Sequence, residues 1–216
     1  FLLDEPGRKK GVYATEWEGI RYLRDLWGMP EGCATLEAQL MDLCDDIAYS
    51  THDIEDGMRA GKIQLNPNFF EDDRLVDSVV REIELDAGNS GVRWDEVDRK
   101  TMVRRVLTDF CREWQEIHAA VGKEPSRARR EVKARWVGKF ASRVGIIDDP
   151  ATNWKRVTFV RDGAEDLELL RTMEILKKLA WVTVIKDVRV QRLHKRSEVM
   201  LRRLWDSFKD YETGRL

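Results

Sequence analysis

The 216-residue sequence lacks any apolar run near the roughly 18 residues that a membrane-spanning helix needs. It is also poor in residues that interrupt helices, with 14 Gly and 5 Pro, whereas 36% of its residues are charged. No signal-peptide pattern is visible. This composition is typical of long amphipathic helices. We therefore expect no membrane partner and an all-α fold.

Cysteine and histidine are equally scarce, with three of each. They are Cys33, Cys44 and Cys111, and His52, His118 and His194. An odd number of cysteines outside metal-binding spacing predicts reduced thiols and a cytoplasmic protein. A metal site needs three or four converging ligands, and no two histidines lie close together in the sequence. We therefore expect no complete metal site within this chain.

The net charge of −2 conceals an uneven distribution. Residues 1–122 hold 15 Lys and Arg against 26 Asp and Glu, whereas residues 123–216 hold 23 against 14. One interpretation is that the two parts pack on each other or on neighbouring subunits. The other is that the basic part faces a polyanion such as a phosphate chain or nucleic acid. We take 1–122 and 123–216 as the two regions of the chain, the second packing on the first.

Apolar periodicity and helix-stop residues predict the elements. The expected helices span about 16–27, after a Thr15–Glu18 capping box, then 35–60, 72–86, 95–121, 126–143 and 164 to the C-terminus, the last with a bend near Val184–Val188. Gly61 is the expected C′ residue of the second helix. Residues 145–153 are expected to form a loop. Arg156–Val160 and the following turn could add one short β-hairpin.

The helix expected over 35–60 has an unusual polar face. At about 100° per residue, Tyr49, His52, Asp53 and Asp56 fall within roughly 80° of Asp45, with Asp42 near the same edge. Leucine, isoleucine and methionine side chains occupy the opposite side. No Lys or Arg occurs between Asp42 and Asp56.

Two explanations of this face remain open. A face that only meets water explains the amphipathicity, but it does not explain the single sign of charge. Like charges three or four residues apart destabilise a helix by roughly 0.2–0.5 kcal/mol per pair. A binding site accounts for that cost. The adjacent His52 and Asp53 point about 100° apart, so they do not form a metal-binding pair by themselves.

The stretch "LEAQLMDLCDDIAYSTHDIEDGMRAGKI", Leu36 to Ile63, closely resembles the bacterial deoxyguanosinetriphosphate triphosphohydrolase-like family of the HD-domain superfamily. The segment "GRKKGVYATEWEGI" before it and the C-terminal helices are similar to the same family more loosely. The resemblance implies the C-terminal part of an HD-domain-like helical bundle. It also implies a homo-oligomer that hydrolyses a deoxynucleoside triphosphate to the deoxynucleoside and triphosphate.

The resemblance also assigns residues. Asp45 corresponds to the last of four ligands of a divalent metal, such as Mn²⁺, Mg²⁺, Fe²⁺ or Ni²⁺. The family's first His and its His-Asp pair have no counterpart in this chain, so the metal site is incomplete here. We expect no turnover by the chain alone and no catalytic residue within it. The missing N-terminal segment is therefore an expected partner.

Tyr49 and Asp53 correspond to positions that meet the deoxyribose and its 3′-hydroxyl, and Asp46 and Arg59 are candidates for support. For Tyr49, the alternative is helix packing. For Arg59, it is a partner of the C-terminal helix carbonyls. Several basic residues are candidates for triphosphate contact: Lys155, Arg156, Arg171, Lys177 and Lys178. The competing hypothesis is a non-catalytic helical module that binds nucleotide or nucleic acid through the basic region.

Overall fold

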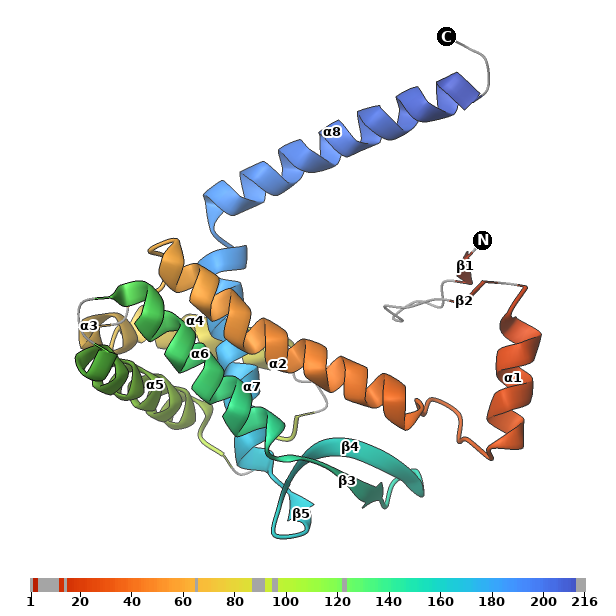
Figure 1. The fold of residues 1–216 in the computed structure, drawn as a ribbon, viewed down its shortest axis with the longest axis horizontal. Coiled ribbons are helices and arrows are strands. Elements are labelled where there is room, and N and C mark those ends of the chain that lie inside the picture. The colour runs from red at the N-terminus through yellow and green to blue at the C-terminus, as the bar shows by residue number, and fades with distance from the viewer. Residues whose placement is uncertain are drawn as a thin grey trace.

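The computed structural model describes residues 2–3, 12–13, 15–64, 66–86, 92–94, 97–121 and 124–212. Its helices are α1 (Trp17–Leu26), α2 (Leu36–Arg59), α3 (Pro67–Phe70), α4 (Asp73–Asp86), α5 (Arg99–Val121), α6 (Pro125–Ala141), α7 (Leu167–Ala180), the π-helix η1 (Trp181–Ile185) and α8 (Val188–Glu212). The strands are β1 (Leu2–Leu3), β2 (Val12–Tyr13), β3 (Val144–Asp149), β4 (Trp154–Arg161) and β5 (Ala164–Glu165). The all-α class with a short hairpin is confirmed (Figure 1).

Helix α2 begins and ends where its sequence indicates. The Thr35 hydroxyl accepts a hydrogen bond from the Ala38 amide at 3.2 Å, which satisfies one of the free amides of the first turn. Gly61 has a φ of +67°, as a C′ residue requires. The Lys62 amide then donates to the Gly57 carbonyl at 2.8 Å and the Gly61 amide to the Met58 carbonyl at 3.1 Å, which together form a Schellman motif.

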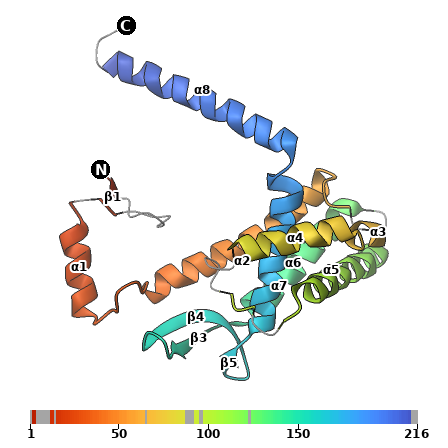
Figure 2. The same cartoon turned by 180° about the vertical axis from the view of Figure 1, so that it is seen from behind.

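The core lies between α2, α4, α5, α6 and α7, and α7 runs through its centre behind α2 (Figures 1 and 2). A row of aromatic rings continues it toward the sheet. Phe110, Trp136, Phe140 and Phe159 follow one another with ring centroids 5.5–5.7 Å apart. Residues from both sides of position 122 therefore share one buried cluster. The division of the chain at 122 stays a prediction.

The loop expected over 145–153 is wrong in its first part. Gly145–Asp149 belong to β3, which pairs antiparallel with β4 from Val144 opposite Phe159 to Asp149 opposite Trp154. Only residues 150–153 form the turn. The turn-forming residues from Asp148 onward concealed the short apolar stretch before them, which is too short to show a period. β5 adds to the other edge of β4, where continuous helix was expected.

Smaller differences concern helix ends. "NPNFFEDD" contains the one-turn helix α3 and not only a loop. Residues 97–98 precede α5 without being helical, and 95–96 lie outside the described residues. At α1, Glu16 is the N-cap and makes no side-chain capping bond, so the capping box at Thr15 is wrong. The bend near Val184–Val188 is confirmed, because η1 interrupts the helix between α7 and α8.

Two helices project from the bundle. In Figures 1 and 2, α1 lies beyond the N-terminal end of α2, and α8 extends away from the bundle beyond η1. No described residue of α1 is buried, and the described side chains of α8 are exposed or only half-buried. None of the described helices combines the length and apolar character needed to span a bilayer.

Ion pairs join the acidic and basic parts of the chain. Five link an acidic residue before position 123 to a basic residue after it: Asp46–Lys177, Glu55–Lys133, Glu82–Lys186, Asp86–Lys178 and Glu113–Arg135, at 2.5–3.4 Å. Glu55, Lys133 and Lys178 are largely covered by neighbouring side chains, so water screens these pairs less than a surface pair. The structure supports the interpretation that the two parts pack on each other.

Candidate functional site

The polar face of α2 carries the predicted site residues. Asp45, Tyr49 and Asp53 are spaced four residues apart in one uninterrupted helix, so they lie on the same face over two turns. Leu43, Ile47 and Ile54 are buried on the other side. The Asp45 side chain is exposed, Tyr49 is 55% exposed and Asp53 is half-buried. The face is therefore accessible to a ligand.

The acidic side chains of α2 fall into two groups. Asp46 accepts from the Lys177 ammonium of α7 at 2.8 Å, and Glu55 pairs with Lys133 of α6 at 2.5 Å. These two carboxylates hold α2 against its neighbours. In the part of the chain that the structure describes, no donor bonds to the side chains of Asp45, Tyr49 or Asp53.

Asp53 has an altered acidity. Partial burial raises the pKa of its carboxyl above the usual 3.8, and the Asp56 carboxylate one turn later raises it further. His52 acts in the opposite direction but is outweighed. Partial desolvation and a like charge disfavour the ionised form, and a ligand hydroxyl that donates to the carboxylate would relieve part of that cost. The raised pKa indicates that the folded protein disfavours the ionised form of Asp53.

The support candidates lie in different places. Asp46 is adjacent to Asp45 but turns toward α7, where its ion pair with Lys177 fixes the packing of α2. Arg59 occupies the last turn of α2, exposed, and about 21 Å along the helix axis from Asp45. At that distance it cannot contact a ligand atom bound to Asp45. Its place in the last turn matches the alternative interpretation, in which Arg59 interacts with the free carbonyls at the C-terminal end of the helix.

The five basic candidates all have partners within the protein. Lys155 pairs with Asp148 at 2.5 Å and Arg156 with Glu165 at 2.7 Å. Arg171 donates to the Arg93 carbonyl at 2.7 Å, and Lys178 pairs with Asp86 at 2.6 Å. Lys177, through Asp46, is the one of the five whose side chain contacts α2 in an ion pair. Lys177 is therefore the best placed of the set to reach a ligand on the α2 face.

The described residues do not make a metal site by themselves. Among them, no three His, Cys, Asp or Glu side chains converge as a metal would require. Asp45 and its neighbours are spread along one helix face, and a single helix cannot surround an ion with four ligands. A metal held by Asp45 would need donors from another segment.

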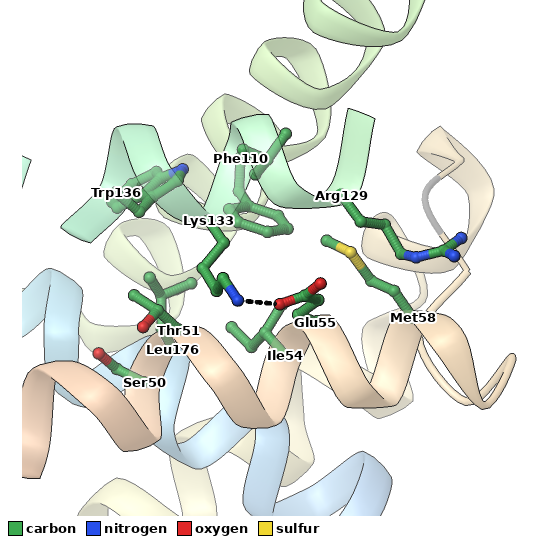
Figure 3. Close-up of a pocket in the computed structure, with 11 residues that line it drawn as sticks. Ser50, Thr51, Ile54, Glu55, Met58, Phe110, Arg129, Lys133, Trp136 and Leu176 are labelled. Atoms are coloured by element: carbon green, nitrogen blue, oxygen red, sulfur yellow. Dashed lines mark ion pairs between the residues drawn. The ribbon is translucent and has the colours of Figure 1, made fainter. Parts of the chain in front are cut away.

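A small hollow lies between α2 and α6, away from the polar face (Figure 3). Its volume is about 10 Å³, room for about one water molecule. Ile54, Met58 and Phe110 line it, together with Glu55 and Lys133, which form an ion pair. It is too small for a nucleotide and reflects imperfect packing of α6 on α2.

A wider open hollow lies over α5, α6 and α7, with a volume of about 570 Å³. Most of its charged side chains neutralise one another. Arg105 pairs with Glu168 and Arg112 with Asp109, while Lys139 stands over the Trp136 ring at 4.3 Å. The mixed and paired charges select no ligand of one sign.

Two residues of the quoted motif have roles that the sequence reasoning missed. The Gln39 side chain donates to the Lys155 carbonyl at 3.1 Å and accepts from the Val157 amide at 2.9 Å, so it ties the start of α2 to β4. Gly57 allows η1 to approach, because a Cβ there would lie 2.8 Å from both Ile63 and Val184 side-chain carbons. A glycine inside a long helix was the available signal for such close packing.

The fold and the site define a helical-bundle protein in which Asp45, Tyr49 and Asp53 lie on one accessible face of α2 and, among the described residues, accept or donate no side-chain hydrogen bond. The chain is 35% identical over 91 residues to a deoxyguanosinetriphosphate triphosphohydrolase-like protein of Bifidobacterium longum. The matched stretch covers 42% of this chain and 18% of the relative. It is 31% identical over 135 residues to the protein of the same name in Streptomyces coelicolor, covering 61% and 29%.

A third relative matches over nearly the whole chain. It is deoxyguanosinetriphosphate triphosphohydrolase-like protein 2 of Vibrio cholerae. The two are 22% identical over an alignment of 216 positions, which covers 97% of this chain and 45% of the relative. The matched stretches span less than half the length of each of these three proteins. No family model matches the chain. The resemblance to this family, noted from the α2 motif, is confirmed.

Proposed function

We propose that this chain is part of a metal-dependent deoxynucleoside triphosphate triphosphohydrolase and supplies the sugar-binding face of its active site. One observation carries the proposal. On α2, Asp45, Tyr49 and Asp53 form no side-chain hydrogen bond or ion pair with the described residues, while Asp46 and Glu55 on the same helix are paired. Carboxylates left unpaired at a cost to helix stability are typical of binding sites.

In this proposal each residue has one task. Asp53 accepts a hydrogen bond from the 3′-hydroxyl of the sugar, which favours the carboxylate over the protonated form that burial promotes. Tyr49, one turn before, packs its ring beneath C2′ and leaves no room for a 2′-hydroxyl. Together they select a deoxyribonucleotide.

Asp45 is proposed as one carboxylate ligand of a divalent ion such as Mn²⁺, Mg²⁺, Fe²⁺ or Ni²⁺. Oxygen donors suit all four ions. Because the described residues offer no three converging ligands, the remaining donors are proposed to come from outside the described residues. The ion, when bound, would polarise the α-phosphate.

Lys177 is proposed as the triphosphate contact nearest to Asp45. Its ammonium lies 2.8 Å from Asp46 and 3.7 Å from Glu174, which is 4% exposed. A triphosphate on the α2 face would compete with Asp46 for this cation. The competing hypothesis of a nucleic-acid-binding module has less support, because many of the basic side chains on which it depends pair with acidic residues of the same chain.

The test is triphosphate release from dGTP by the complete gene product that contains this chain, with Mn²⁺ present. The variant Asp45→Asn keeps the shape of the side chain and loses the charge. We expect it to abolish release, by at least about 1000-fold, which removal of one essential charge interaction of about 4 kcal/mol would cause.

The matched control is Glu37→Gln, the same loss of charge at an exposed residue on another face of α2. It should keep wild-type release and unfolding. Retention of most of the activity by Asp45→Asn, with Mn²⁺ still bound, would remove Asp45 from the role. Release of single phosphates in place of triphosphate would replace the proposed reaction by stepwise hydrolysis.

A further inference from the structure

Helix α8 carries an apolar stripe that nothing in the described chain covers. The stripe consists of Leu193, Met200, Leu201, Leu204 and Phe208, whose side chains are between 54% and 68% exposed. At 100° per residue all five lie within roughly 60° of Leu204. Five large apolar side chains gathered on one side of an exposed helix mark an interaction surface.

The stripe is nearly symmetric along the chain. Leu193 and Phe208 lie equally far from the midpoint between Met200 and Leu201, whereas the position that mirrors Leu204 is the small residue Ser197, which lies outside the stripe. Leu193 and Met200 are seven residues apart, and Leu204 and Phe208 follow Leu201 in steps of three and four, which are spacings of helices that pack side by side. A two-fold axis through that midpoint would place the stripe of one antiparallel helix directly over the stripe of another.

The charges of α8 also favour the antiparallel arrangement. Its first nine residues, 188–196, hold four Lys and Arg and no Asp or Glu. Its last nine, 204–212, hold three Asp and Glu and one Lys. An antiparallel pair places the basic end of each helix beside the acidic end of the other, whereas a parallel pair places the basic ends together.

The placement of α8 leaves the stripe free for a partner. The helix extends from the bundle beyond η1, and its base is fixed to the end of α2, where Lys62 pairs with Asp187 at 2.5 Å (Figures 1 and 2). The Asp187 carboxylate also accepts from the Arg189 amide at 2.9 Å and so caps α8. The helix is thus held at one end and open along its length.

We propose that the α8 stripe pairs with the α8 stripe of a second copy of this chain, antiparallel, about the midpoint between Met200 and Leu201. Each helix is about 37 Å long and about 10 Å across, so the contact covers a strip of roughly 400 Å² on each partner. This lies at the low end of specific interfaces. The dimer is therefore reversible, with a dissociation constant on the order of micromolar.

The first experiment measures self-association of the 216-residue chain by sedimentation equilibrium across a wide concentration range. The double variant Leu193→Glu with Leu204→Glu removes two stripe positions. It should raise the dissociation constant at least about 100-fold, because two large apolar contacts per chain are lost and two charges would be buried. Circular dichroism should show unchanged helix content, since glutamate is a strong helix former.

The matched control is Val199→Glu, an exposed apolar residue of the same helix on the side away from the stripe. It should leave the dissociation constant within about threefold of the wild type. A wild-type chain that stays monomeric, or an equal effect of Val199→Glu, overturns the proposal. So does stripe-dependent binding of a monomeric chain to phosphatidylserine vesicles or to single-stranded DNA, either of which would identify a different occupant.

A second experiment tests the direction of pairing. In a background with Cys33→Ser and Cys44→Ser, the variant Leu193→Cys is mixed with the variant Phe208→Cys and oxidised gently. Antiparallel pairing places position 193 of one chain opposite position 208 of the other, so a mixed disulfide between the two variants should dominate. Disulfides formed only between identical variants would show parallel pairing and overturn the proposed arrangement.

Discussion

At the scale of single residues, the proposed sugar selection depends on two side chains one turn apart, Tyr49 and Asp53. A buried acceptor left without its hydroxyl costs roughly 1–3 kcal/mol. A 2′,3′-dideoxynucleotide should therefore bind the complete gene product more weakly than the deoxynucleotide by about that amount. Asp53→Ala should erase most of this difference, because the unpaired acceptor is gone. Titration of the wild type and the variant with both nucleotides measures it.

Tyr49→Ala should act differently from Asp53→Ala. It opens space beside C2′, so ribonucleotides should gain turnover relative to deoxynucleotides. The measurement is triphosphate release from dGTP and GTP by both proteins. If the variant still rejects GTP as strongly as the wild type, the steric account of Tyr49 is wrong and the residue returns to helix packing.

The raised pKa of Asp53 predicts that the variant Asp53→Asn gains stability over the wild type as pH rises. Because the pKa of its carboxyl is raised in the folded state, folding favours the protonated form. Asp53 therefore costs nothing below the ordinary value of 3.8, and its cost appears as pH rises through the raised pKa. Asp53→Asn should be more stable than wild type near neutral pH by roughly a few tenths of a kcal/mol, the scale of one like-charge pair with Asp56.

Urea unfolding at neutral and acidic pH measures this difference, which should shrink as pH falls. Asp56→Asn provides the matched test of the cause. It removes one of the two causes of the raised pKa, so a proton titration by NMR should show a lower pKa for Asp53. A less stable Asp53→Asn protein at neutral pH would contradict the assignment of Asp53 as a group held at a cost.

At the scale of elements, replacing glycine by alanine should have opposite effects on the free energy of unfolding at Gly57 and at Gly138. Gly57→Ala gains roughly 1 kcal/mol of helix propensity but places a methyl 2.8 Å from Val184, and such overpacking costs about 1–3 kcal/mol. We expect a net loss of roughly 1 kcal/mol in the free energy of unfolding. Gly138→Ala in α6 meets no atom within 4 Å and should gain about 0.5–1 kcal/mol.

Chemical denaturation of both variants gives the comparison. A second change, Val184→Ala in the Gly57→Ala protein, should recover part of the loss by making room for the methyl. If Gly57→Ala stabilised the protein as much as Gly138→Ala, the close packing of α2 against η1 would not hold in solution.

The elements that the sequence predicted are those with a strong period or a clear stop. Helix α2 has 24 residues with one apolar side, a capping threonine and Gly61, so its bounds were predictable. Strand β3 was not, because its apolar residues are few and adjoin turn-forming residues. The tie from Gln39 to β4 joins positions more than 100 residues apart, which no local pattern can reveal.

The candidate site was predictable for a different reason. Helical spacing alone places Asp45, Tyr49 and Asp53 on one face, and the structure keeps them there. Which acids stay unpaired depends on tertiary contacts. Asp46 and Glu55 look like Asp45 in the sequence, and they differ because α7 and α6 bring Lys177 and Lys133 to them.

At the scale of the whole molecule, the chain should bind no divalent ion tightly. One carboxylate on an open helix face offers too few donors, and no three candidate ligands converge among the described residues. Isothermal calorimetry of the 216-residue chain with Mn²⁺ should show no stoichiometric binding, and dGTP should stay intact. Tight one-to-one binding would show that the chain holds a complete site.

The π-helix at Trp181–Ile185 joins the core helix α7 to the projecting helix α8. An arm about 37 Å long that turns by about 10° at its base moves its far end by about 6 Å. Two contacts join the base of this arm to the C-terminal end of α2, the helix that carries Asp45. They are the close approach of Val184 to Gly57 and the Lys62–Asp187 ion pair. A rotation of α8 at this base would therefore displace Phe208 much farther than it displaces the residues that contact α2.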